Sequence, residues 1–201
     1  MAIRMLVVGL AYSSALSLAA PFEARDGLLT VQYRDLRDRA QIPFVFEAWK
    51  DTVRDLEKIG LKPQATTITA FSSAAEFARA TGEPWFISAS TLGGKIRTQR
   101  LGALRQRGML EFTVRHEAFH TVQPATLPRW LAEGLARHFS GEDAKDPKGS
   151  TGLEGVSNGA LEQVLLGRGD QLKLNAAYFE ATRRAARLVQ AQGWKVALEM
   201  R

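Results

Sequence analysis

The chain has 201 residues, with 27 Lys and Arg against 21 Asp and Glu, and no cysteine. The missing cysteines exclude disulfides, thiolate metal ligands and a lipoprotein anchor. The net charge is +6, and positive charge is concentrated in one stretch, where Glu111 is the only acidic residue. The basic residues of this stretch are Lys95, Arg97, Arg100, Arg105, Arg107 and Arg115. A nucleic-acid interface would also need interleaved aromatic residues, so we expect no nucleic-acid partner. These side chains indicate a solvated surface or, alternatively, a preference for acidic substrates.

The first 20 residues have the order of a secretory signal peptide. Arg4 is their only charge, an apolar run covers residues 5–12, and small residues stand at Ser17 and Ala19. An uncleaved membrane anchor and an ordinary buried helix are alternatives, although the run is marginal for a span. We predict export to the periplasm or the exterior. Residues 21–201 would then form a single domain with no membrane span.

Apolar periodicity predicts alternating strands and helices in the first half of the chain. Apolar and polar residues alternate over residues 28–33, which predicts a strand. Apolar residues recur at intervals of three and four over residues 44–59, which predicts an amphipathic helix ended by Gly60. Further expected elements are a strand over residues 65–71, a helix from the Ser73 cap to about residue 80, and a hairpin of residues 85–90 and 95–101.

The second half is expected to be mainly helical. Pro124 ends one helix, and Pro128 suits the first turn of the next. Residues 140–155 are rich in Gly, Asp and Lys, which predicts a mobile loop at the rim of the site. The last expected elements are a short helix over about residues 160–166 and a long helix from the Asn175 cap to about residue 192, closed by Gly193.

Residues 116–120 are His-Glu-Ala-Phe-His, an HExxH motif. On a helix, this spacing places His116 and His120 on one face, as two ligands of a zinc ion. Glu117 lies on the adjacent stripe, where its carboxylate can take a proton from a metal-bound water. The motif therefore carries metal ligands and a general base together.

A catalytic zinc needs a third protein ligand. The metzincin arrangement, with a third histidine six residues beyond the motif, is excluded because that position is Thr126. A short turn between the two helices would let Glu133 swing back over the histidines. His138 could compete, but it lies on a different helical stripe, where solvent exposure is expected.

The segment HEAFHTVQPATLPRWLAEGLARHF, residues 116–139, resembles the gluzincin peptidases. It is most similar to the bacterial peptidase-MA-like domains, whose pattern is HExxH followed by LPxWLxEGLA. The resemblance implies that Glu133 is the third zinc ligand. It also implies an α+β, zincin-like fold, in which a small mixed β-sheet packs on the HExxH helix and the C-terminal half is helical. Residues 87–97 would then form the cleft wall along which an extended substrate adds as a strand.

Two departures limit what the resemblance implies. Thermolysin-type enzymes place an aspartate four residues after the glutamate ligand to orient a zinc histidine, whereas this chain has Arg137 there. The outer partners of the histidines must therefore come from elsewhere. No GAMEN-type segment for holding a peptide amino terminus is present, so exopeptidase action is not supported. Tyr178, expected in the first turn of the last helix, is a candidate donor to the oxyanion, and packing beside Phe179 is the alternative.

These observations predict a zinc-dependent metallopeptidase, expected to act as an endopeptidase on peptides or proteins. His116, His120 and Glu133 would hold the zinc, and Glu117 would pass a proton from the water to the leaving amine. A structural zinc would close its fourth position with Cys or His, and neither is available nearby. The alternatives are a catalytically silent exported binding module of the same fold and a zinc hydrolase acting on cell-wall material. The oligomeric state does not follow from the sequence.

Overall fold

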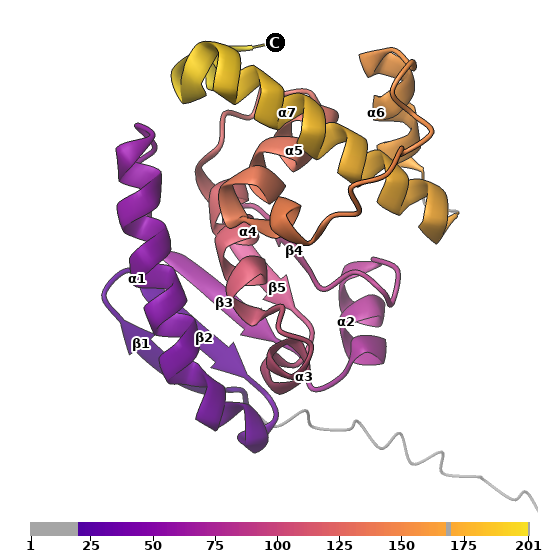
Figure 1. Ribbon diagram of the computed structural model, residues 1–201. Helices are drawn as coiled ribbons and strands as arrows, with labels where there is room; N and C mark the ends of the chain where they lie inside the picture. The colour runs from indigo at the N-terminus through magenta and orange to yellow at the C-terminus, as the bar shows by residue number, and fades with distance from the viewer. Residues whose placement is uncertain (1–19, 168–169, 201) are drawn as a thin grey trace, which may run out of the picture.

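The computed structural model describes residues 20–167 and 170–200, which form a mixed α and β structure (Figure 1). Its five-stranded sheet has the order β1-β2-β3-β5-β4. Neighbours β2, β3 and β5 run parallel, while β1 and β4 are antiparallel edge strands, so the sheet is mixed, as predicted. The strands are β1 (Phe22–Asp26), β2 (Leu29–Tyr33), β3 (Thr66–Ala70), β4 (Ala89–Leu92) and β5 (Lys95–Thr98).

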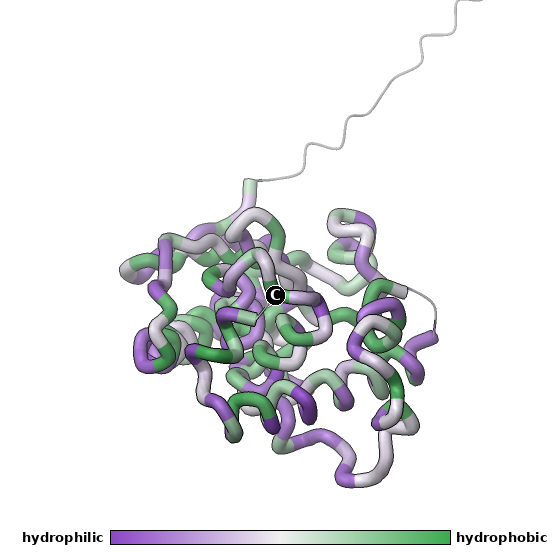
Figure 2. Tube along the Cα trace, turned by 90° about the horizontal axis from the view of Figure 1, so that it is seen from above, coloured by the Kyte–Doolittle hydropathy of each residue, from purple (hydrophilic) through white to green (hydrophobic). Residues whose placement is uncertain are grey.

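One face of the sheet carries the hydrophobic core. The first, third and fifth residues of β2 are buried and alternate with half-buried polar residues, as expected for a strand covered on one side. Helices α1 (Ile42–Lys58) and α4 (Leu110–Val122) pack against each other and against this face. Figure 2 shows hydrophobic and hydrophilic residues alternating along the helices, the pattern from which α1 was predicted. The first predicted helix and the first two predicted strands are confirmed, with small shifts in their bounds.

The region around β5 differs from the prediction. The predicted hairpin is present, but its first strand, β4, covers residues 89–92 instead of 85–90, and β5 ends at Thr98 instead of residue 101. Helix α3 (Leu101–Gln106), which was not predicted, follows. The buried carboxylate of Asp38, in the 3₁₀ helix η1 (Leu36–Gln41), accepts hydrogen bonds from the N–H groups of Leu101 (3.1 Å) and Gly102 (2.8 Å). A carboxylate at this position satisfies the first N–H groups of a helix and complements its dipole. Helix α2 (Ala74–Thr81) begins at the Ser73 cap, as predicted.

The C-terminal half is helical, as predicted. It contains α5 (Arg129–Ser140), the 3₁₀ helix η2 (Glu142–Lys145), α6 (Asn158–Leu166) and α7 (Gln171–Glu199). The predicted cap at Asn175 is wrong, because the Asp170 carboxylate caps α7 by accepting from the N–H groups of residues 172 and 173. Gly193, with φ of 81°, interrupts α7 without ending it, since the chain is helical again up to Glu199.

Helix α5 packs closely on α7, and Gly134 makes this possible (Figure 1). A Cβ atom on Gly134 would lie 2.4 Å from the carbonyl oxygen of Ala181 and 2.9 Å from the Cβ of Ala185. Atoms in a protein interior do not approach so closely, so only glycine fits at this helix contact. The contact also fixes the position of Glu133, the preceding residue.

The irregular segment of residues 146–157 is hydrogen-bonded to side chains of α7. Arg183 donates to the carbonyl oxygens of residues 147 and 149, at 2.5 and 2.6 Å. Arg184 donates to the carbonyl oxygens of residues 153 and 156 and pairs with the buried Glu180. Residues 140–155 were predicted as a mobile loop. Residues 142–145 form η2 instead, and these bonds hold most of the irregular remainder against α7.

Ala20 is the one residue of the predicted signal peptide, residues 1–20, that belongs to the described part of the chain. The rest of that prediction lies outside the described residues. Over residues 20–167 and 170–200, no helix combines the length and the apolar character needed to cross a membrane.

Candidate metal centre

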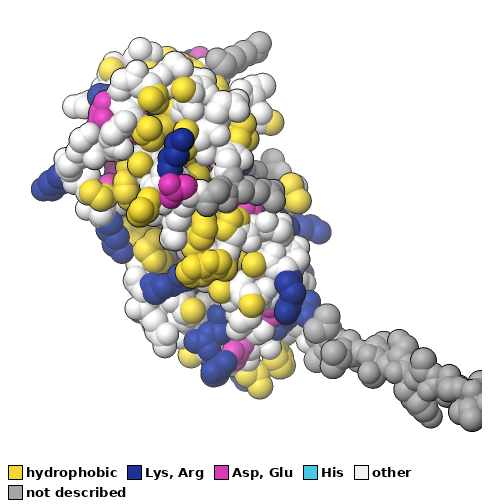
Figure 3. All heavy atoms as spheres, turned by 90° about the vertical axis from the view of Figure 1, so that its right-hand side faces the viewer, with side chains coloured by type: hydrophobic (Ala, Val, Ile, Leu, Met, Phe, Trp, Pro, Cys, Tyr) yellow, Lys and Arg dark blue, Asp and Glu magenta, His cyan; other side chains and the backbone are white. Residues whose placement is uncertain are grey.

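A cleft of about 800 Å³ lies between the edge of the sheet and the helical half. Residues 86–94, which include β4, form one wall, and α4, α5 and the first part of α7 contribute the other. Figure 3 views the molecule from the side on which α2 and α6 lie, and hydrophobic side chains gather in the middle of this face. Leu92 and Leu166 line the cleft and are 67% and 54% exposed. The cleft therefore offers both a strand edge and apolar side chains to a ligand.

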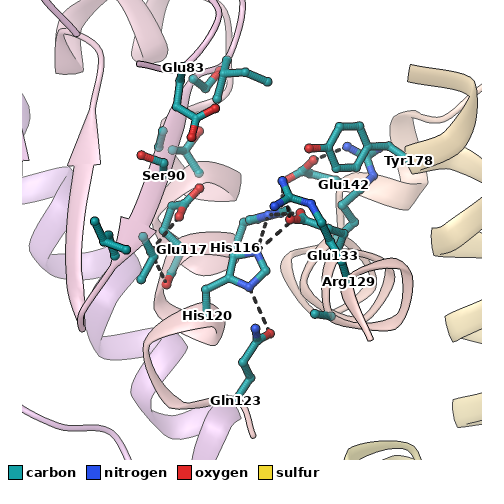
Figure 4. A pocket seen from close by; sticks show the side chains of 18 of the residues that line it. Glu83, Ser90, His116, Glu117, His120, Gln123, Arg129, Glu133, Glu142 and Tyr178 are labelled. Carbon is teal, nitrogen blue, oxygen red and sulfur yellow. Dashed lines mark hydrogen bonds and ion pairs between the residues drawn. The ribbon is translucent and has the colours of Figure 1, made fainter. Parts of the chain in front are cut away.

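The three predicted metal ligands come together at this cleft (Figure 4). The Nε2 atoms of His116 and His120 are 3.0 Å apart, and each lies 3.5 Å from Oε2 of Glu133. Zinc bonds of 2.0–2.2 Å in tetrahedral geometry place neighbouring ligand atoms about 3.3 Å apart. The triangle of side-chain atoms therefore fits a zinc ion that keeps one further position.

The local sequence explains why these side chains converge. The histidines follow each other by one turn of α4, and residues 123–128 make a tight connection in which the N–H of Leu127 donates to the carbonyl of Pro124. The first N–H groups of α5, at Arg129 and Trp130, donate to the Glu162 carboxylate of α6, at 2.9 and 2.8 Å. A carboxylate bound to these groups stabilises the start of α5, one turn before Glu133.

Each ligand has its own outer partner. Nδ1 of His116 donates to Oε1 of Glu142 at 3.1 Å, and Nδ1 of His120 donates to Oε1 of Gln123 at 3.0 Å. Oε1 of Glu133, the oxygen turned away from the histidines, lies 3.5 Å from the guanidinium of Arg129. Such partners orient the metal-facing atoms of the ligands.

Arg137, which replaces the expected aspartate, supports the site indirectly. Its guanidinium donates to Oε2 of Glu142 at 2.6 Å and to Thr182 on α7 at 3.0 Å, and it also pairs with Asp146. The carboxylate that orients His116 is therefore Glu142, five residues beyond Arg137. Glu142 was not predicted from the sequence, where the only signal for it was the cation at position 137, which calls for an acidic partner.

Glu117 is buried beside the three ligands but is not one of them. Its side chain is turned toward the strand wall, where the Thr91 hydroxyl of β4 donates to Oε2 at 2.7 Å (Figure 4). Burial raises the pKa of the Glu117 carboxyl above its ordinary value, against the opposing effect of the two histidines. A carboxylate with a raised pKa accepts a proton more readily at neutral pH.

The charges around the histidines favour a bound cation. Burial lowers the pKa of His116, but the carboxylates of Glu142, Glu133 and Glu117 outweigh this effect and raise the pKa to about 10. Burial also disfavours the ionised form of Glu133, yet the two histidines bring its pKa well below the ordinary value. The same carboxylates that hold a proton on His116 would attract a divalent metal in its place.

Tyr178 lines the cleft, but it lies two turns inside α7 rather than in its first turn. Burial raises the pKa of its hydroxyl, as does the carboxylate of Glu133, so the hydroxyl keeps its proton at neutral pH. The positive charge of Arg129 opposes this rise in the pKa of the Tyr178 hydroxyl. No role for Arg129 was predicted from the sequence.

His138 does not join the ligands. It is half-buried rather than exposed, its ring stacks on Trp194 at 5.7 Å between centroids, and Nδ1 lies 2.6 Å from Asp143. The basic residues that suggested acidic substrates are also elsewhere, since none of the six lines the cleft. Arg115, for example, pairs with Asp55 of α1 at 2.9 Å. The acidic-substrate interpretation therefore loses its basis in those residues.

No family model, curated protein or solved structure matches this chain. The resemblance of residues 116–139 to the peptidase-MA-like domains accordingly stays a prediction from the motif.

Proposed function

We propose that this protein is a zinc-dependent peptidase of zincin-like fold. The observation that carries the proposal is the triangle of His116, His120 and Glu133 atoms, at 3.0 to 3.5 Å, with the buried Glu117 beside it in an open cleft. A zinc ion in this position would supply Lewis-acid chemistry, polarising the scissile carbonyl and acidifying a water.

The side chains around the ligands support proton transfer. Glu117 would accept a proton from the attacking water and return it to the leaving amine. The Thr91 hydroxyl holds the Glu117 carboxylate at 2.7 Å, which keeps it on the strand side of the cleft. Tyr178 would donate a hydrogen bond to the oxygen that becomes negative at the scissile carbonyl.

Strand β4 supports an extended peptide as the substrate. Gly93 and Gly94, both with positive φ, form a two-residue turn, so Leu92 and Lys95 are a hydrogen-bonded pair. Bonded pairs alternate along an antiparallel ladder, and the hydrogen bond from the N–H of Gln99 to the carbonyl of Ser88 follows this alternation. The backbone groups of residues 89 and 91 therefore point away from β5. A peptide could pair with them by strand addition, which favours endopeptidase action.

The donor set also argues against a structural zinc. Such a site usually has four protein ligands. Among the described residues, the cluster contains three, and His138 is turned to Trp194. A silent binding module would have no need to bury the Glu117 carboxylate, which costs free energy.

The experiment compares zinc-loaded wild type with Glu117→Gln on denatured casein and on peptidoglycan. Glu117→Gln should keep its zinc but lose about 10²- to 10⁴-fold in the rate of casein hydrolysis. Glu111→Gln, an exposed glutamate on the same helix, is the matched control and should remain active. Cleavage of peptidoglycan alone would replace the peptidase with a cell-wall hydrolase. Zinc-loaded wild type that cuts neither substrate would favour the binding module.

A further inference from the structure

Arg129 carries a positive charge into the cleft, and the only role given to it so far is that of outer partner of Glu133. It lies in the first turn of α5, and its side chain is 45% exposed and lines the cleft. Figure 4 shows it beside Glu133 and Tyr178, on the wall opposite Glu83.

The structural contacts of Arg129 leave its charge poorly balanced. Glu162 binds the backbone N–H of Arg129, not its guanidinium. Within the described chain, Glu133 is the only carboxylate at ion-pair distance from the guanidinium, at 3.5 Å. Glu133 also faces both histidines, so a divalent cation bound there would take up its charge. Arg129 would then present an unpaired cation to the cleft.

Tyr178 brings a second donor to the same place from α7. The Tyr178 hydroxyl lies in the same cleft beside Arg129 (Figure 4), and because it keeps its proton it can donate to a ligand as the guanidinium does. Glu83 and Glu117 lie on the strand side, so an anion would be repelled there and held against the α5–α7 wall. The two donors therefore define one small region next to the metal ligands.

We propose that Arg129 and the Tyr178 hydroxyl together bind a negatively charged oxygen of the substrate. This inference rests on the proposed peptidase function. The oxygen has two possible sources: the terminal carboxylate of a peptide cut near its end, or the carbonyl oxygen that becomes negative during cleavage of an internal bond. A terminal carboxylate would make the enzyme trim C-termini.

The test uses zinc-loaded protein with Arg129→Gln, Tyr178→Phe and the control Arg54→Gln, an exposed arginine of α1 that pairs with Asp51. Zinc content is measured first in each variant. Calorimetry then gives the Kd values of two probes. The first is an N-acetylated tripeptide with a free C-terminal carboxylate, compared with the same tripeptide as its amide. The second is a phosphonate analogue of a peptide bond. Finally, kcat and KM are measured on a peptide blocked at both ends.

A terminal-carboxylate site predicts that wild type binds the free acid at least about tenfold more tightly than the amide, and that Arg129→Gln removes the difference. An oxyanion site predicts equal binding of acid and amide. Both cleft variants would then lower kcat about 10- to 100-fold, leave KM unchanged and weaken phosphonate binding. Either result supports the proposal, provided that Arg54→Gln behaves as wild type.

The proposal is overturned if both cleft variants retain zinc and bind both probes as wild type does. If Arg129→Gln loses zinc, the probe affinities of Tyr178→Phe are compared with those of wild type instead, because Tyr178 is not an outer partner of any ligand. Unchanged affinities in Tyr178→Phe would overturn the proposal. Probe binding needs no hydrolysis. If the protein cuts no peptide, the proposed peptidase function is refuted, while calorimetry still shows whether Arg129 and Tyr178 bind an anion.

Discussion

Replacing Gly134 by alanine should destabilise the fold and weaken metal binding together. The added Cβ would lie 2.4 Å from the Ala181 carbonyl oxygen, whereas a carbon and an oxygen in contact are about 3.3 Å apart. Helices α5 and α7 would have to separate by roughly 0.9 Å. Overpacking of this kind typically costs about 1–3 kcal/mol of folding free energy, or about 2 to 12 °C in Tm for a domain of this size. Because Glu133 precedes Gly134, the same movement would shift one metal ligand against the other two.

The assay is thermal and denaturant unfolding of the zinc-free protein, followed by zinc titration. Gly159→Ala is the matched control, since Gly159 is also helical but has only the Ser157 hydroxyl, at 4.0 Å, near its added Cβ. That change should be neutral or stabilise by up to about 1 kcal/mol. If Gly134→Ala is as stable as wild type and binds zinc equally well, the close contact of α5 and α7 does not exist as described.

Three further predictions follow from the site and the N-terminus. Glu142→Gln should weaken zinc affinity about 10- to 100-fold in a competition titration, and an affinity equal to that of wild type would remove Glu142 as the partner of His116. In zinc-free protein, His116 has a pKa raised to about 10, so its contribution to stability is complete below the unfolded pKa near 6.5 and is lost as the pH rises toward 10. Unfolding in denaturant at several pH values should show this loss in wild type but not in His116→Gln. Mass spectrometry of the native protein should find a start between residues 20 and 22, while an intact Met1 in a soluble cytoplasmic fraction would contradict the predicted export.

Elements with a strong internal period could be predicted from the sequence. Helix α1 and strands β2 and β3 each bury residues at the spacing of their own secondary structure, so local sequence is sufficient. Strand β1 was missed because Phe22–Asp26 is an exposed edge with two acids and an arginine, and it exists by pairing with β2. Helix α3 was missed because its cap, Asp38, is 63 residues away. Such elements depend on tertiary partners that a local pattern does not contain.

The site divides in the same way. The HExxH spacing makes His116 and His120 candidate ligands, and the short turn to α5, together with the resemblance, adds Glu133. These residues could be predicted because they are close in sequence and lie on two adjoining helices. Arg129 belongs to the same segment, but its position beside Tyr178 depends on how α5 crosses α7, which no periodicity records. Residues that hold the metal ligands were therefore harder to predict than the ligands themselves.

Arg137 illustrates how far a local departure can be interpreted. An arginine has no hydrogen-bond acceptor, so it cannot orient a histidine N–H in place of the expected aspartate. The histidine therefore needs an acceptor from another residue, and a carboxylate could serve the arginine as well. Glu142, Asp143 and Asp146 all follow within nine residues, and sequence alone does not choose among them. The 3₁₀ helix η2 determines the partner, because it directs Glu142 back to His116. Asp143 pairs with His138 instead, and Asp146 pairs with Arg137. A requirement for a partner could thus be inferred from the sequence, whereas the identity of that partner depends on the path of four residues after α5.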